Sequence, residues 1–113
     1  MKKIFFIVVL FCVLGIKAQS SEGVNKNYKT SVLVKGNCEM CKARIEKSAL
    51  TTKGVKYAVW DVNSKMLNLI YNQNKTTLLQ IQASILEVGH DVDSLKTNEE
   101  VYQQLHMCCQ YRE

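Results

Sequence analysis

The chain of 113 residues contains no proline, only one tryptophan and only two histidines. The absence of proline excludes a proline-rich linker and a proline-rich peptide ligand. The net charge is +5, but the first 18 residues hold three lysines and no acidic residue, so the remainder carries only +2. This weak charge is not that of a nucleic-acid-binding protein. The sequence also lacks a Ser/His/Asp set, a carboxylate pair and a glycine-rich phosphate loop, so we expect a protein that is not an enzyme.

Long hydrophobic runs are missing except at the start of the chain. Lys2 and Lys3 precede an apolar run over residues 4–16, and small residues follow it. This order is typical of a signal peptide, and the run is shorter than the ~20 residues that a bilayer span needs. We therefore expect a signal peptide over residues 1–18, a flexible segment over residues 19–27, and a periplasmic or secreted protein with no membrane attachment after cleavage. An uncleaved anchor is the alternative.

Four of the five cysteines lie beyond this leader, at Cys38, Cys41, Cys108 and Cys109. An even number of cysteines in an exported protein first suggests disulfides. However, Cys108 and Cys109 are adjacent, and a bridge between neighbours falls outside normal disulfide geometry. Metal ligation is therefore a serious alternative.

The remaining 95 residues, of which 39 are apolar, suit one small domain. Alternating apolar residues predict strands, which are residues 28–35, 55–62, 66–71 and 92–95. Residues spaced as on a helix predict two helices, which are residues 40–51 and a segment capped by Thr76 or Thr77 that runs to Val88. The order βαββαβ is that of an α+β, ferredoxin-like sandwich. In the strand over residues 55–62 both alternating sets are apolar, so the pattern leaves its buried face open.

Residues 96–113 form an extension beyond this unit. Thr97 and Glu100 match a capping box that would begin a third helix. We expect this C-terminal helical extension to carry further metal ligands, namely His106, Cys108 and Cys109. The alternatives are a tail cysteine bridged to one of the first two, or buried cysteines with no ligand role.

The motif Cys38-Glu39-Met40-Cys41 is where the chemistry concentrates. One thiol in a loop and one at a helix start can converge on a soft ion, and the helix N-terminus lowers the thiol pKa. Two thiolates satisfy Cu(I) but leave tetrahedral zinc half coordinated. Copper(I) is therefore the expected ion, with zinc or mercury as alternatives. A structural disulfide and a thiol–disulfide oxidoreductase remain rival interpretations, although the motif lacks the aromatic and proline neighbours typical of the latter.

Several stretches around this motif match one known family. They are Gly36-Asn37-Cys38-Glu39-Met40-Cys41, Ile45-Glu46, Gly54-Val55, residues 67–71 and Val88-Gly89-His90. Over residues 28–95 the chain resembles the heavy-metal-associated (HMA) domain family, which comprises copper chaperones, metal-binding domains of copper-transporting ATPases and periplasmic mercuric-ion-binding proteins. The resemblance implies a ferredoxin-like fold and metal ligation by Cys38 and Cys41. It also implies transfer of the ion by ligand exchange to a metal-transport ATPase or another metalloprotein.

The chain departs from the family's pattern at three places. The family usually has Gly-Met-x-Cys where this chain has Gly36-Asn37-Cys38, so the methionine that packs under the loop is missing. An aromatic residue commonly follows the glycine after the second helix, where this chain has His90. In this fold that position lies beside the Cys loop, so we expect His90 to be an auxiliary ligand or to adjust access to the ion. A solvated loop residue is the alternative. The extension over residues 96–113 is the third departure.

Overall fold

The computed structural model describes residues 24–112. The predicted signal peptide and most of the predicted flexible segment lie outside the described residues. The elements in chain order are β1 (Tyr28–Leu33), α2 (Glu39–Thr51), β2 (Val55–Trp60), β3 (Met66–Tyr71), α3 (Leu78–Glu87), α4 (Glu99–Gln103) and a short 3-10 helix, η2 (Met107–Cys109). No helix within residues 24–112 has the length and apolar character needed to cross a bilayer.

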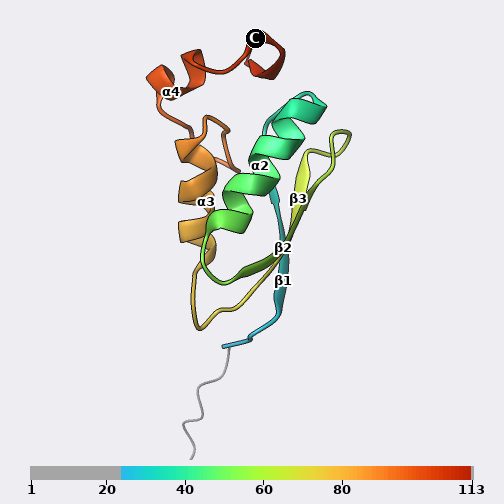
Figure 1. Ribbon diagram of the computed structural model, residues 1–113, viewed down its shortest axis with the longest axis vertical. Coiled ribbons are helices and arrows are strands. Elements are labelled where there is room, and N and C mark those ends of the chain that lie inside the picture. Colours follow the sequence, from blue (N-terminus) through green and yellow to red (C-terminus); the bar gives the residue numbers. More distant parts are fainter. Residues whose placement is uncertain (1–23, 113) are drawn as a thin grey trace, which may run out of the picture.

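The three strands form an antiparallel sheet in the order β1-β3-β2. The helices α2 and α3 lie side by side over one face of this sheet (Figure 1). Both helices bury apolar residues against the sheet, as Ile45 and Ile81 show, because the helical spacing puts these positions on one face. In β2 the buried residues are Ala58 and Trp60, which decides the face that the sequence pattern left open. The fold is the predicted α+β, ferredoxin-like arrangement.

The last predicted strand, over residues 92–95, is wrong as a strand. Val92 forms only an isolated bridge with Val34 and a second one with Leu95. Asp93 between them has a positive φ of 51°, which turns the chain back on itself. The Asp93 carboxylate accepts a hydrogen bond from the backbone amide of Leu33 at 3.1 Å. The sheet edge beside β1 is therefore closed by a tight turn rather than by a fourth strand.

The predicted capping box at Thr97 is also wrong. The helix cap is Asn98, whose side chain accepts a hydrogen bond from the amide of Glu100 at 2.8 Å. The hydroxyl of Thr97 instead donates to the carbonyl of Leu86. The helix α4 ends at Gln103, so His106 and Cys109 do not share a helix face. The chain then continues through η2, whose cap is His106.

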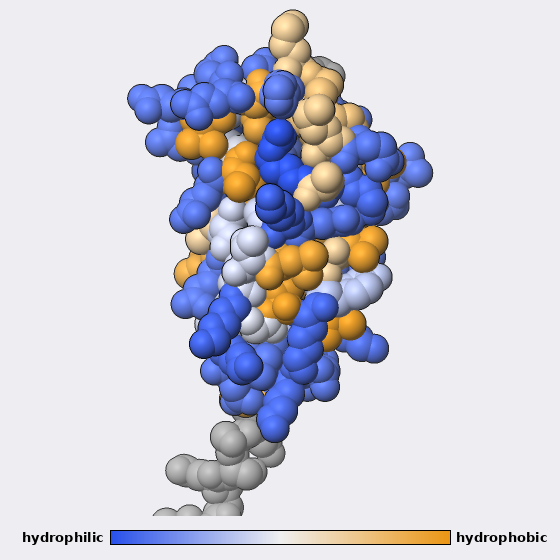
Figure 2. All heavy atoms as spheres, viewed as in Figure 1, coloured by the Kyte–Doolittle hydropathy of each residue, from blue (hydrophilic) through white to orange (hydrophobic). Residues whose placement is uncertain are grey.

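The extension closes one end of the domain. In Figure 1 the red C-terminal segment lies across the end where α2 begins, and η2 contacts α2. Figure 2 shows a moderately hydrophobic, pale-orange strip at this end, flanked by hydrophilic surface. The segments that meet here expose the sulfur-containing side chains of Met40, Met107 and Cys108. The tail therefore reaches the cysteine loop rather than extending into solvent.

Candidate metal centre

The two cysteines of the CxxC motif stand at the start of α2. Cys38 is the cap residue of this helix, with extended backbone angles (φ −154°, ψ 172°), and its carbonyl accepts the first helical bond from the amide of Lys42 at 3.0 Å. Cys41 lies in the first turn and is completely buried, whereas Cys38 is half-buried. The two sulfur atoms are 3.2 Å apart. The loop-to-helix transition thus brings both thiols to one point.

Gly36 and Trp60 explain how the shortened loop packs. A Cβ atom on Gly36 would lie 3.0 Å from the Cβ of Cys41 and 3.2 Å from the ring of Trp60. Trp60 is fully buried, and its indole N–H donates to the carbonyls of Val34 at 3.0 Å and Lys65 at 3.2 Å. The indole of Trp60 therefore lies directly under the loop. Only glycine allows so close an approach at position 36.

The two thiols of the motif differ in acidity. Burial alone would raise the pKa of Cys38, but hydrogen bonds from the backbone amide of Cys41 and from the thiols of Cys41, Cys109 and Cys108 outweigh it and lower the pKa to about 7. Burial raises the pKa of Cys41 to about 12, and the neighbouring sulfur atoms add to this effect. The Cys41 thiol contacts the side-chain oxygen of Asn37 at 3.4 Å. Cys38 is therefore the thiol that ionises first.

The structure brings both tail cysteines to this pair. The sulfur of Cys109, which is completely buried, lies 3.5 Å from that of Cys38. Cys108 is exposed, and its sulfur lies 3.9 Å from those of both Cys109 and Met40. The sulfur atoms of Cys38, Cys108 and Cys109 all lie within 4.8 Å of one another. Cys38 and Cys109, which are 71 positions apart in the chain, thus belong to one sulfur cluster with Cys108. Cys41 is outside this group of three and joins the cluster through its 3.2 Å contact with Cys38.

His90 lies beside the approach to the loop and is fully buried. Its Nδ1 is 2.7 Å from the carbonyl of Lys35, and its ring stacks on Tyr111 with centroids 5.6 Å apart. Burial lowers the pKa of His90, and the positive charge of Arg44 acts in the same direction. The neutral ring can therefore donate from Nδ1 to the Lys35 carbonyl. His90 is therefore not a solvated loop residue. Its role as a ligand stays a prediction, because its ring nitrogens are not among the ligand atoms of Cys38, Cys108 and Cys109 that lie within 4.8 Å of one another.

His106 does not join the cluster in the structure. It is exposed at the start of η2 and, like His90, is absent from the group of ligand atoms that lie within 4.8 Å of one another among residues 24–112. The predicted pairing of His106 with Cys109 depended on helical spacing, which ends at Gln103. Of the six predicted ligands, the structure therefore brings together the four cysteines.

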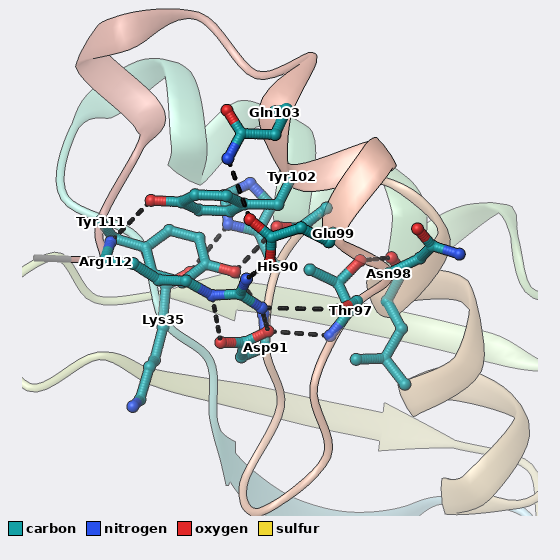
Figure 3. Close-up of polar contacts among 12 residues, drawn as sticks. Lys35, His90, Asp91, Thr97, Asn98, Glu99, Tyr102, Gln103, Tyr111 and Arg112 are labelled. Atoms are coloured by element: carbon teal, nitrogen blue, oxygen red, sulfur yellow. Dashed lines mark hydrogen bonds and ion pairs between the residues drawn. The ribbon is translucent and has the colours of Figure 1, made fainter.

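Sequence reasoning missed the residues that anchor the tail. The guanidinium of Arg112 pairs with the buried carboxylate of Asp91, with an N–O distance of 2.8 Å, and also with Glu99 at 2.8 Å (Figure 3). It lies over the ring of Tyr102, 4.3 Å from the centroid. The hydroxyl of Tyr111 accepts from the amide of Asp91 and donates to the carbonyl of Gly89, both at 2.8 Å. The two tyrosines of the tail, which accompany the apolar residues Val101 and Leu105, were the available signal that it packs on the domain.

No protein-family model matches the sequence, and no curated protein matches it. Solved structures do match. One is the CopZ metallochaperone, with a TM-score of 0.56 and 24% identity over 57% of this chain and 98% of that chain. Another is the copper form of a CopA variant from Bacillus subtilis, with a TM-score of 0.54 and 29% identity over 63% of this chain and 95% of that chain.

The chain has an HMA-like fold. A third match of this fold is oxidised MerP from Ralstonia metallidurans, with a TM-score of 0.57 and 15% identity over 59% of this chain and 94% of that chain. These comparisons confirm the resemblance to copper chaperones and MerP that the sequence motifs indicated. Among the neighbours of this HMA-like domain, one is named a metallochaperone and another is described in a copper form. Its sulfur cluster fits the binding of a soft metal ion.

Proposed function

We propose that the mature protein is an exported metal carrier or scavenger that binds Cu(I) through Cys38 and Cys41 and passes it on by ligand exchange. One observation carries this proposal. The half-buried sulfur of Cys38 lies 3.2 Å from the buried sulfur of Cys41 at the start of a helix. Thiolates are the ligands that Cu(I) prefers, and a helix N-terminus stabilises their negative charge.

The choice of copper rests on chemistry and on the neighbours. Two thiolates complete the coordination of a linear Cu(I) ion, whereas zinc takes four ligands. One matched structure is described as the N-terminal domain of a potential copper-translocating P-type ATPase from Bacillus subtilis in the Cu(I)-loaded state. Zinc and mercury are the alternatives that a competition experiment has to separate. A metal-transport ATPase or another metalloprotein is the expected acceptor.

The two thiols differ in acidity and burial, and this difference supports a stepwise transfer of the ion in which Cys38 releases it before Cys41. Cys38 is the more exposed thiol, and its pKa is lowered to about 7. A thiolate of the acceptor binds the ion, the bond to Cys38 breaks, and Cys38 takes up the proton that the acceptor thiol lost. The oxidation state of copper does not change. Cys41, which is buried, holds the ion until a second acceptor ligand replaces it.

Copper binding is tested by titrating the reduced mature protein with Cu(I) against a chromophoric chelator. We expect Cys38→Ser to weaken the Cu(I) affinity strongly. Glu39→Gln is the matched control, because it changes an exposed residue between the two cysteines and leaves every sulfur atom in place. An unchanged affinity in Cys38→Ser would contradict the proposal. Parallel titrations with Zn(II) and Hg(II) decide the ion.

Export is tested separately from metal binding. The basic, apolar and small residues of the first 18 positions support cleavage near Gln19. The intact mass of the protein recovered from outside the cytoplasm should therefore lack residues 1–18. A mass that includes them would contradict the signal peptide.

A further inference from the structure

The sulfur atom of Cys38 has two close sulfur neighbours rather than one. It lies 3.2 Å from Cys41 and 3.5 Å from Cys109. With metal–sulfur bonds of ~2.3 Å, two sulfurs on one ion lie about 3.8 Å apart in a tetrahedral site and about 4.6 Å apart in a linear site. Both observed separations are closer to the tetrahedral value. An ion beside Cys38 is therefore within reach of Cys109 as well as Cys41.

Cys108 adds a fourth sulfur at the rim of this cluster. Its sulfur lies 3.9 Å from that of Cys109 and 3.9 Å from the thioether of Met40. Cys108 and Met40 are exposed, whereas Cys41 and Cys109 are completely buried. The cluster therefore has an inner part, formed by the two buried thiols with Cys38, and an outer part at the surface.

The position of the tail cysteines is held from both sides. Before them, Tyr102 and Leu105 are buried against the domain. After them, Arg112 pairs with Asp91 at 2.8 Å, and Tyr111 bonds to the backbone of Gly89. Between these anchors, the amide of Cys109 donates to the carbonyl of His106 at 2.8 Å and closes the turn of η2. Such fixed placement is what a metal ligand needs, because a preorganised donor loses little freedom when the ion binds.

Gly89 contributes to this placement. It has a positive φ of 102°, and a Cβ atom there would lie 2.9 Å from the side chain of Leu105. Position 89 therefore requires glycine both for its backbone conformation and for the close approach of the tail. The end of α3 is thus shaped to receive the extension.

We infer that the C-terminal extension is part of the metal site and that Cys109 is a third thiolate ligand, with Cys108 beside it as a fourth sulfur at the surface. This inference rests on the proposed function, because Cys38 and Cys41 hold the ion in either case. Three or four thiolates also satisfy ions that two thiolates leave under-coordinated, such as divalent zinc or cadmium. An acceptor must displace more ligands from such a site, so the extension favours retention of the ion.

The first test compares Cu(I) affinities of reduced variants under chelator competition. Substitutions that only disturb the orientation of a ligand weaken metal binding by roughly tenfold or more, so Cys109→Ser should weaken it by at least about tenfold. Met107→Ser is the matched control, because it removes an exposed sulfur from the same turn. If Cys109→Ser equals the wild type while Cys38→Ser loses affinity, the inference is wrong and the proposed function stands. If Cys38→Ser also equals the wild type, the proposed function is wrong.

A second test needs no variant, because Cys109 is buried and its substitution can disturb folding. X-ray absorption of the wild-type protein loaded with one equivalent of Cu(I) counts the sulfur neighbours of the ion. We expect three or more sulfur neighbours. Two neighbours would overturn the inference whatever the variants do, and would confine the ion to the CxxC loop. Absence of bound copper would instead count against the proposed function.

Discussion

The guanidinium of Arg112 binds the carboxylate of Asp91 through two contacts, Nη2 to Oδ1 at 2.8 Å and Nε to Oδ2 at 3.3 Å. Asp91 follows directly after His90, beside the approach to the cysteine loop, and its side chain is buried. Arg112 follows the tail cysteines by three residues. This bidentate pair therefore ties the end of the extension to the part of the domain that supports the metal loop.

Arg112→Gln should destabilise the protein, because it leaves the buried Asp91 carboxylate without its charged partner. We expect a loss of about 1–3 kcal/mol in the free energy of unfolding, measured with urea. Lys53→Gln is the control, since Lys53 is an exposed cation whose side chain has no hydrogen bond or ion pair with any residue between positions 24 and 112. The Cu(I) affinity of Arg112→Gln should also fall, because Cys109 is no longer held in place. Equal unfolding energies in the two variants would contradict the anchoring role.

Stability should decrease at acid pH through Asp91. Burial raises its pKa, but hydrogen bonds from Arg112 and from the amide of Thr97 outweigh burial and hold the pKa below its ordinary value. A carboxyl whose pKa is lower in the folded state stabilises the protein above its unfolded pKa of about 3.9, and this contribution disappears as the pH falls through the folded value. Unfolding free energies at neutral pH and below pH ~4 should therefore differ more in the wild type than in Asp91→Asn. The same acid-dependent loss in both proteins would contradict this role of Asp91.

Gly36→Ala should disturb the metal loop. The added methyl group would lie 3.0 Å from the Cβ of Cys41 and 3.2 Å from the ring of Trp60, and both neighbours are completely buried. We expect a loss of about 1–3 kcal/mol in stability and a weaker Cu(I) affinity. Thermal unfolding and chelator competition measure the two effects. If Gly36→Ala had the stability and the Cu(I) affinity of the wild type, the loop would accommodate the methyl group, and the prediction would be wrong.

Cys108→Ser tests whether the exposed sulfur of Cys108 helps to hold the ion in addition to the inner sulfur atoms. Cys108 is exposed, so its substitution should change stability by no more than about 0.5 kcal/mol. We expect a slower release of Cu(I) to an excess of chelator in the wild type than in this variant, because one more sulfur has to be displaced. Stopped-flow absorbance of the chelator complex measures the rate. Identical rates would remove Cys108 from the site and leave Cys109 as the tail ligand.

Local patterns in the sequence were enough to predict most of the elements. Alternation located the hairpin of β2 and β3, and helical spacing located α2 and α3 to within two residues at their ends. The CxxC motif and its flanking residues pointed to the HMA-like fold, which the solved structures confirm. These features depend on residues that are close in the chain, and the sequence displays them directly.

Only the tertiary structure showed the features that depend on contacts between residues far apart in the chain. A turn at Asp93 replaces the predicted last strand, because the side chain of Asp93 binds the amide of Leu33, 60 positions away. The direction of Trp60, the burial of His90 and the short length of α4 likewise follow from packing rather than from periodicity.

The sequence by itself determined the soft-ligand chemistry of the protein, since four cysteines after residue 18 and their CxxC spacing are visible in its letters. Only the tertiary structure decided that these cysteines meet. Cys38 and Cys109 are 71 positions apart, and no periodic pattern connects them. The path of the tail depends instead on the fit of Tyr111 and Arg112 to the backbone and carboxylate around Asp91. A contact of this kind requires surfaces that exist only after the domain has folded.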